Sequence, residues 1–564
     1  MQPINRTYAP VQAFVDELAR CGVRHAVTSP GSRNAPLALV LAEQPGIEAV
    51  SVIDERSAGF VAVGIARATG APVAVTCTSG TAAANLHPAV AEAREASVPL
   101  LVLTADRPPE LRDVGAGQSI DQLGLYGSAA KWFHEVGGHE PGRATAVHHR
   151  GLACRAVATA AGGRPGPVHL NFPLREPLAP RPEDLDAADW EGRPDGSPWV
   201  AVEREPGAGG AAALREWIGG AERGVIVCGE APGEMAAPAA ALAAALGWPL
   251  LADPASGVRS GPHDRSHVVA HYDVLLRVEA FAAGHRPERV LRVGEPPVSQ
   301  SLRAWLAGTD QAVIDPRVTW HDPTREARLV AAGDPATLLA ELAGEGGGGD
   351  PAWVESWRAA DAAVPRALAE SPAGFEGAIP AALAPALPDD ALLWVAHSMP
   401  VRDVEAFLPS TPRPLRVLAA RGANGIDGVV SAATGAALGA GRPAHLLTGD
   451  VALLHDAGGL ISARRAGAEL TIVCVNNGGG GIFDFLPVAA AADASAYERH
   501  VATPHGVDLA ELAALGGLAH RVAATPEEVA GAVATPALVE VRTDRAENVR
   551  LHAALVERVA ELVP

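Results

Sequence analysis

The sequence has few of the features that mark secreted, membrane-bound or metal-clustered proteins. Its 564 residues include five cysteines, and no two of them form a Cys-x-x-Cys pair, which argues against a zinc cluster or a disulfide framework. No apolar run reaches the roughly 20 residues that a transmembrane helix needs. The segment that begins Met1-Gln-Pro lacks the basic and apolar regions of a signal peptide. We therefore expect a cytoplasmic protein.

Positive charge is also scarce. Asp and Glu number 65 against 45 Lys and Arg, the net charge is −20, and Lys131 is the single lysine. This acidity argues against a nucleic-acid partner and against a membrane surface. If the substrates are anions, locally placed arginines must overcome an unfavourable overall field.

The remaining composition, 48% hydrophobic and 20% charged, is ordinary for a globular enzyme of two to four domains. Stretches rich in proline and glycine at 180–210 and 344–351 predict linkers between three α/β blocks. We place the domains at 1–182, 208–343 and 352–564. Each block alternates alanine-rich helical segments with short apolar runs typical of buried parallel strands, at 26–29, 49–53, 73–78, 100–104, 224–228, 289–293, 311–315, 445–448 and 470–475.

The last two of these runs end in polar residues. The first stops at Gly449-Asp450, and the second stops at Asn476-Asn477 and a run of glycines, 478–481. A helix-length segment, 452–468, separates them, so the pattern predicts a βαβ unit whose strand ends share one crevice. Carboxylate and amide oxygens suit Mg²⁺, and glycines let the backbone approach a diphosphate. The segment therefore predicts a metal-diphosphate anchor at Asp450 and Asn477.

Two simpler interpretations compete with this one. Asp450 could cap a helix while Asn477 lies in a turn, but the spacing and the glycine run together favour the anchor. A dinucleotide site needs Gly-x-Gly-x-x-Gly after a first strand and an acidic residue about twenty positions later. The glycine run at 478–481 has no such strand and acid downstream, so this alternative is weak.

The spacing resembles the thiamine-diphosphate motif, with Val451 where many members have a second glycine. The resemblance implies thiamine diphosphate as cofactor, contacted by Gly449 and anchored through Mg²⁺ or Mn²⁺ on Asp450, Asn477 and Gly479. It also implies the thiamine-diphosphate-binding fold in the pyruvate oxidase-like arrangement: pyrimidine-binding, central and diphosphate-binding domains, each a mainly parallel sheet flanked by helices. In that arrangement the cofactor lies between two chains, so a homodimer or homotetramer is expected.

Activation of this cofactor requires a carboxylic acid against its aminopyrimidine ring, after a strand of the first domain and shielded from water. Glu55 follows the apolar run that ends at Ile53, at a predicted strand-to-helix junction. We predict that Glu55 is the catalytic acid, that Asp54 caps the helix and that Arg56 is an ion-pair partner. A glutamate in a first helical turn could also be present only for the helix dipole.

Several loop segments resemble the 2-succinyl-5-enolpyruvyl-6-hydroxy-3-cyclohexene-1-carboxylate synthase family of menaquinone biosynthesis. They are 28–34, 78–85, 104–110 and 117–118 in the first block and 397–403, 421–428 and 476–483 in the third. The resemblance implies a transferase that decarboxylates 2-oxoglutarate and adds the succinyl unit to isochorismate in a 1,4-addition that releases CO₂. The resemblance is weak in the middle block. There the family often has a pair of basic residues after a glycine-containing turn, whereas 294–301 has none, and Arg303 is the substitute we consider.

The same resemblance implies the substrate-binding residues. Both substrates are dicarboxylates, and arginine pairs bidentately with carboxylate. We expect Arg402 and Arg421, with Ser398, to bind the carboxylate retained from 2-oxoglutarate. Arg33 and Arg107 of the facing chain's first domain, with Gln118, are expected to bind isochorismate. Ser32 is expected to donate an additional hydrogen bond to substrate. Around the cofactor, Ile426 resembles the wedge that holds it bent, and Ile482, Phe483 and Leu486 are expected to exclude water.

Two other functions remain open from the sequence. An acetolactate synthase or simple 2-oxoacid decarboxylase would use the same cofactor but would not need several carboxylate-binding arginines. A non-catalytic protein with a decayed site would not be expected to retain Glu55, Asp450 and Asn477 together.

Overall fold

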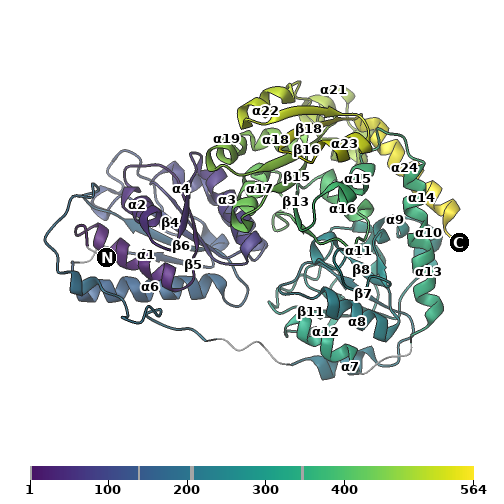
Figure 1. Ribbon diagram of the computed structural model, residues 1–564, viewed down its shortest axis with the longest axis horizontal. Coiled ribbons are helices and arrows are strands. Elements are labelled where there is room, and N and C mark those ends of the chain that lie inside the picture. The colour runs from purple at the N-terminus through teal and green to yellow at the C-terminus, as the bar shows by residue number, and fades with distance from the viewer. Residues whose placement is uncertain (1–2, 138–139, 204–208, 345–348) are drawn as a thin grey trace.

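The computed structural model describes residues 3–137, 140–203, 209–344 and 349–564. It contains three six-stranded sheets, all of whose strand pairs are parallel, each flanked by helices. In Figure 1 the N-terminal domain lies on the left, the central domain at the lower right and the C-terminal domain above it. The predicted α/β class is confirmed. Among the described residues, no helix has the length and apolar character needed to cross a membrane.

The first sheet has the strand order β2-β1-β3-β4-β6-β5. One of its faces packs against α1 (Tyr8–Arg20), α2 (Ala35–Glu43) and α6 (Arg143–Ala161), and the other packs against α3 (Glu55–Thr69). Its strands are β1 (His25–Thr28), β2 (Glu48–Ser51), β3 (Val73–Cys77), β4 (Leu100–Asp106), β5 (Trp132–Glu135) and β6 (Val168–Pro173).

The third sheet repeats this order as β14-β13-β15-β16-β18-β17. The helical segment predicted over 452–468 is two helices, α18 (Asp450–His455) and α19 (Ala457–Ala466). They break at Asp456, whose buried carboxylate accepts hydrogen bonds from the backbone N–H and hydroxyl of Ser431. The strands are β13 (Ala391–Val395), β14 (Leu415–Leu418), β15 (Ala444–Gly449), β16 (Leu470–Asn476), β17 (Ala519–Ala523) and β18 (Ala537–Arg542).

The central sheet has a different order, β12-β11-β10-β7-β8-β9. Helices α13 (Pro351–Asp361) and α24 (Arg545–Leu562) pack on it, with Trp357 fully buried, and connect it to the third domain. Its strands are β7 (Gly224–Cys228), β8 (Leu250–Ala252), β9 (Val268–Val269), β10 (Arg289–Val293), β11 (Gln311–Ile314) and β12 (Ala327–Ala331).

Every apolar run that we expected to form a strand does so, with ends shifted by at most two residues. The predicted domain limits remain predictions. Residues 204–208 and 345–348, which belong to the two predicted linkers, lie outside the described residues.

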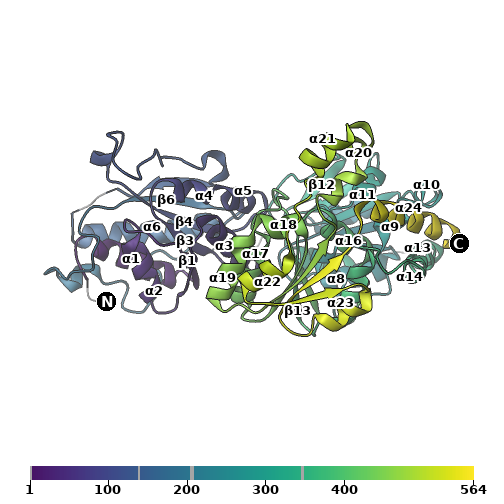
Figure 2. The ribbon, with the colours of Figure 1, turned by 90° about the horizontal axis from the view of Figure 1, so that it is seen from above.

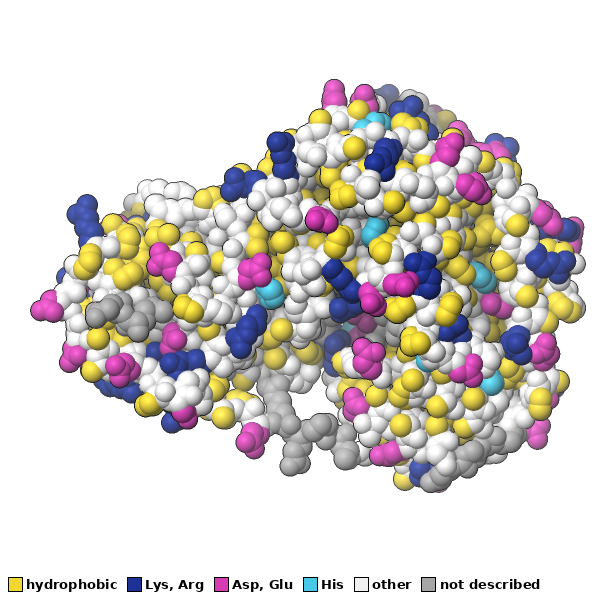
Figure 3. Space-filling view, in the orientation of Figure 1, with side chains coloured by type: hydrophobic (Ala, Val, Ile, Leu, Met, Phe, Trp, Pro, Cys, Tyr) yellow, Lys and Arg dark blue, Asp and Glu magenta, His cyan; other side chains and the backbone are white. Residues whose placement is uncertain are grey.

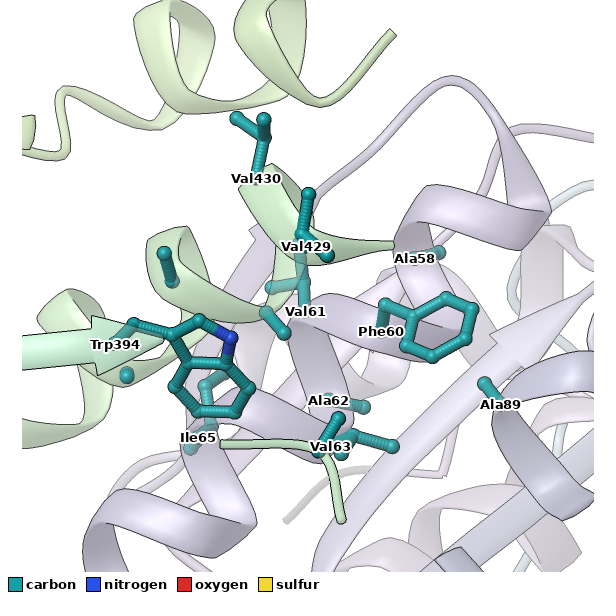
Figure 4. Close-up of a cluster of buried hydrophobic side chains, with 14 of the residues drawn as sticks. Ala58, Phe60, Val61, Ala62, Val63, Ile65, Ala89, Trp394, Val429 and Val430 are labelled. Atoms are coloured by element: carbon teal, nitrogen blue, oxygen red, sulfur yellow. The ribbon is translucent and has the colours of Figure 1, made fainter. Parts of the chain in front are cut away.

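The first and third domains meet where α3 crosses α17 (Val429–Ala440), and the two helices lie side by side in Figures 1 and 2. Val61 and Ile65 of α3 and Val429 of α17 belong to one hydrophobic core that spans both domains (Figure 4). Glycines allow the close approach. A Cβ on Gly64 would lie 2.0 Å from the carbonyl oxygen of Ala432, and one on Gly435 would lie 2.0 Å from that of Val61. The helices are therefore in backbone contact at this crossing.

We predict that Gly64→Ala destabilises the protein by at least the roughly 1–3 kcal/mol typical of an overpacked core. The new methyl group meets the backbone of the opposite helix, which cannot move aside as a flexible side chain would. Thermal unfolding measures the effect. Gly284→Ala is the matched control, because a Cβ there meets open space. Equal melting temperatures for the two variants would contradict this interpretation of the crossing.

Candidate active site

A pocket of about 820 Å³ lies where the three domains meet. On the face shown in Figure 3, basic and acidic side chains gather near the centre of the molecule. The first domain contributes Arg67, and the central domain contributes Arg303, the central-domain arginine considered from the sequence. Most of the wall comes from the third domain and includes Ser398, Arg402, Arg421, Ile426, Gly449, Asp450, Asn477, Gly479, Ile482 and Phe483.

Asp450 and Asn477 meet at the carboxyl ends of adjacent strands, as predicted. β15 and β16 pair in parallel, with Gly449 opposite Val475. The Asp450 carboxylate is fixed by three groups. The backbone N–H of Gly479 donates to Oδ2 at 3.0 Å, and Nε2 of His505 lies 3.2 Å from the same oxygen. The backbone N–H of Val451 donates to Oδ1 at 2.7 Å. The arrangement aims one buried carboxylate at the glycine-rich loop.

Asn477 is oriented by Glu376, a residue that the sequence did not reveal. The Asn477 amide nitrogen donates to Oε1 of Glu376 at 3.1 Å, and the hydroxyl of Thr543 donates to the same oxygen at 2.7 Å. Burial raises the pKa of Glu376. The Asn477 Oδ1 atom is buried and has no hydrogen-bond partner among the described residues. A hard cation would satisfy this oxygen, so the donor set fits Mg²⁺.

The glycine run provides space for the diphosphate. Gly478 has φ +76°, which favours glycine, and a Cβ on Gly479 would lie 2.4 Å from the carbonyl oxygen of Ala502. Side chains are thereby excluded from the loop beside Asp450. Gly479 thus allows the loop to pack closely on Ala502, and a loop without side chains leaves its backbone groups open to an anion.

Apolar side chains form the wall beside this loop. Ile426, Ile482 and Phe483 line the pocket. Leu486 is 47% exposed and is not among the lining residues, so the structure does not support its predicted role as a cover.

Two arginines of the third domain are held in the pocket by oxygen atoms. The Arg402 guanidinium donates to the backbone carbonyl of Ser398, and burial lowers the pKa of Arg402. Ser398 has φ +73°, a strained conformation for a residue with a side chain. Arg421 pairs with Asp253 of the central domain at 2.6 Å. The second terminal nitrogen of Arg421, Nη2, donates to the backbone carbonyl of Pro296 at 3.0 Å.

The predicted first-domain residues form a second group outside this pocket. Arg107 donates to the hydroxyl of Ser79 at 2.6 Å, and that hydroxyl donates to the carbonyl of Gln118 at 2.9 Å. Burial, together with the nearby Arg107 charge, lowers the pKa of Arg33. Its Nε is buried without a partner among the described residues. Ser32 precedes Arg33 and is exposed. The positive charge of this group suits it to bind an anion. Ser79, which lies in the loop segment 78–85 singled out from the sequence, is an additional member of the group.

Glu55 is not among the residues that line the pocket containing Asp450. Asp54 caps α3, as predicted, by accepting from the N–H groups of Arg56 and Ser57. Arg56 donates to the carbonyl of His455, whereas we had expected an ion pair. Arg67, twelve residues further along α3, does line the pocket and lies about 18 Å from Glu55 along the helix axis at 1.5 Å per residue. One chain therefore presents two separate groups of site residues.

Comparison with known protein families defines the class. Three models match in order: the N-terminal thiamine pyrophosphate-binding domain over 10–125, the middle domain over 188–394 and the C-terminal thiamine pyrophosphate-binding domain over 401–541. The protein is thus a thiamine diphosphate-dependent enzyme with the Mg²⁺ requirement of that class.

Curated relatives narrow the class further. They include several proteins named 2-succinyl-5-enolpyruvyl-6-hydroxy-3-cyclohexene-1-carboxylate synthase. The protein from Geobacillus kaustophilus is 45% identical over 97% of both chains. Those from Myxococcus xanthus and Thermobifida fusca are 44% and 45% identical, over 97% and 99% of this chain and 96% and 100% of their own. The chain belongs to this synthase family.

We predict that Glu376→Gln weakens Mg²⁺-dependent cofactor binding about 10- to 100-fold, the usual effect of losing a group that orients a metal ligand. A glutamine at this position can turn its amide N–H toward Asn477 and donate to Oδ1. The Asn477 Oδ1 atom would then no longer be held free for the metal ion. Calorimetric titration of thiamine diphosphate at several Mg²⁺ concentrations measures this. Thr543→Val serves as the control, because it removes a bond to Glu376 but leaves the Asn477 contact. Equal affinities in Glu376→Gln and the unmodified enzyme would refute the orienting role.

Proposed function

We propose that this protein catalyses the reaction in its relatives' name. 2-Oxoglutarate loses one carboxyl group as CO₂, and the remaining succinyl unit is joined to isochorismate by 1,4-addition. The observation that supports this most strongly is the pair of arginine groups, one around Arg402 and one around Arg107, in a chain aligned with these synthases over almost its whole length. Two dicarboxylate substrates account for both groups. A cytoplasmic location is part of the same proposal.

When bound, thiamine diphosphate supplies the electron sink for decarboxylation. The chain's own groups would hold it through Asp450, Asn477 and the Gly479 backbone, with Gly449 and Ile426 alongside. We assign Glu55 the exchange of a proton with the aminopyrimidine ring. Ile482 and Phe483 would exclude water, so that the succinyl unit reaches isochorismate and not a proton.

The position of Glu55 outside the pocket that contains Asp450 supports an assembly of at least two chains. In a symmetric pair, the first domain of one chain would face the third domain of the other and complete two equivalent sites. Ile53, adjacent to Asp54, is 55% exposed, and Val114, in the loop before Gln118, is 68% exposed, and such a contact would cover both. We propose a homodimer, or a homotetramer built from such dimers.

The function is tested by incubating the enzyme with thiamine diphosphate, Mg²⁺, 2-oxoglutarate and isochorismate and following the loss of isochorismate absorbance. The proposal predicts turnover that requires all four components. Turnover of pyruvate in preference to 2-oxoglutarate would favour an acetolactate synthase or simple decarboxylase instead.

We predict different kinetic effects for the two arginine groups. Arg402→Ala should impair use of 2-oxoglutarate and narrow its advantage over pyruvate, which lacks the second carboxylate. Arg107→Ala should chiefly raise the Michaelis constant for isochorismate. Each charge-assisted hydrogen bond contributes about 1.5–3 kcal/mol, or about ten- to a hundredfold.

Steady-state kinetics with each substrate varied in turn measure both effects. Arg550→Ala is the control, since the Arg550 side chain is 72% exposed on α24. If both active-site variants impair both substrates equally, the proposed division between the arginine groups is wrong.

A further inference from the structure

A cluster of one carboxylate and two thiols lies in the first domain, away from the pocket. Glu17 and Cys21 are at the end of α1, and Cys154 projects from the facing helix α6. The two sulfur atoms are 3.5 Å apart, and the Cys154 sulfur is 3.5 Å from Oε1 of Glu17. Glu17 is fully buried and Cys154 nearly so. Within the described part of the chain, this is the one group of three His, Cys, Asp or Glu ligand atoms that converge in this way.

These separations match those around a tetrahedral zinc ion. Zn–S bonds of about 2.3 Å and Zn–O bonds of about 2.0–2.2 Å place neighbouring sulfurs about 3.8 Å apart and sulfur and oxygen about 3.5 Å apart. We propose that Glu17, Cys21 and Cys154 form a zinc-binding site. The site was invisible in the sequence, because the cysteines are 133 positions apart and form no local motif.

Groups that would orient the ligands are already in place. Arg150 donates to Oε2 of Glu17 at 2.7 Å, which leaves Oε1 directed at the thiols. The backbone N–H of Val200 donates to the Cys154 sulfur at 3.4 Å, and that of Trp199 donates to Oε1 of Glu17. Such outer contacts accompany metal ligands and fix their geometry.

The charges also balance. Arg150 bridges Glu17 and Asp16, and Arg20 pairs with Asp16, so two carboxylates face two guanidinium groups before a metal binds. A Zn²⁺ ion with two thiolates adds no net charge to this buried group. Binding replaces the two thiol protons with one ion and releases both protons to solvent.

The ion has a route to the site. Cys21 is partly exposed, and a pocket of about 460 Å³ reaches Cys154 between α6 and Val200. Three protein ligands leave a fourth position for water. The bound ion would connect α1, α6 and the segment at 199–200 that leads toward the central domain, so its effect should be on stability.

Cobalt(II) tests the site, because thiolate coordination gives a charge-transfer absorption that oxygen ligands do not. The full-length protein, reduced and freed of metal, should bind one Co²⁺ per chain with this band, and Zn²⁺ should displace it. Cys21→Ser and Cys154→Ser should each weaken or abolish the band, and Glu17→Gln should reduce Co²⁺ affinity at least about tenfold. Cys228→Ser, at a buried cysteine outside the cluster, and Asp450→Ala, at the Mg²⁺ anchor, should retain it.

A second measurement does not depend on spectroscopy. Zn²⁺ should raise the melting temperature of the unmodified protein and leave that of Cys21→Ser unchanged. A band that survives both cysteine variants would overturn the proposal. So would reduced protein that takes up no Co²⁺ but forms a Cys21–Cys154 disulfide with hydrogen peroxide.

Discussion

The contact between α3 and α17 is the constraint on which the arrangement of the site depends. Gly64 and Gly435 bring the two helix backbones together and fix the first domain against the third. α3 runs from Glu55, which does not line the pocket, to Arg67, which does. The pocket that contains the metal anchor therefore lacks the proposed proton-exchanging acid of its own chain. A second chain is the simplest way to bring the two residues into one site.

The buried arginines of the two site groups differ in how fully their charge and N–H groups are paired. Arg421 is neutralised by Asp253 from another domain, whereas Arg402 donates one terminal nitrogen to a backbone carbonyl, which leaves its charge available to a carboxylate. Arg33 keeps one guanidinium nitrogen unpartnered among the described residues. Guanidinium groups whose N–H donors are not all paired can bind substrate carboxylates. Their local positive charge offsets the repulsion between these anions and the net negative charge of the chain.

Much of the fold and part of the site could be predicted from the sequence. Apolar runs bounded by glycine and polar residues define buried parallel strands, and parallel pairing alone places Asp450 beside Asn477. Asp54 was recognisable as a cap because its position before a helix leaves backbone donors to satisfy.

What could not be predicted depends on tertiary contacts between distant segments. Glu376 lies 101 positions from Asn477, and Asp253 lies 168 from Arg421, so no local pattern connects either pair. The break at Asp456 also escaped prediction, although Gly458 and Gly459 follow it in the sequence, and the hydrogen bond that Asp456 accepts from Ser431 of α17 depends on tertiary packing. The position of Glu55 outside the pocket likewise depends on the domain packing.

Mixing two inactive variants tests the central claim that each site is shared by two chains. Glu55→Gln lacks the proposed acid and Asp450→Ala lacks the anchor, so each homodimer should be inactive. After subunit exchange, half of the dimers are mixed, and each has one site with both residues intact. The account predicts recovery of about a quarter of the unmodified activity. If the mixture stays inactive although mass spectrometry detects mixed dimers, Glu55 and Asp450 do not serve one site from different chains.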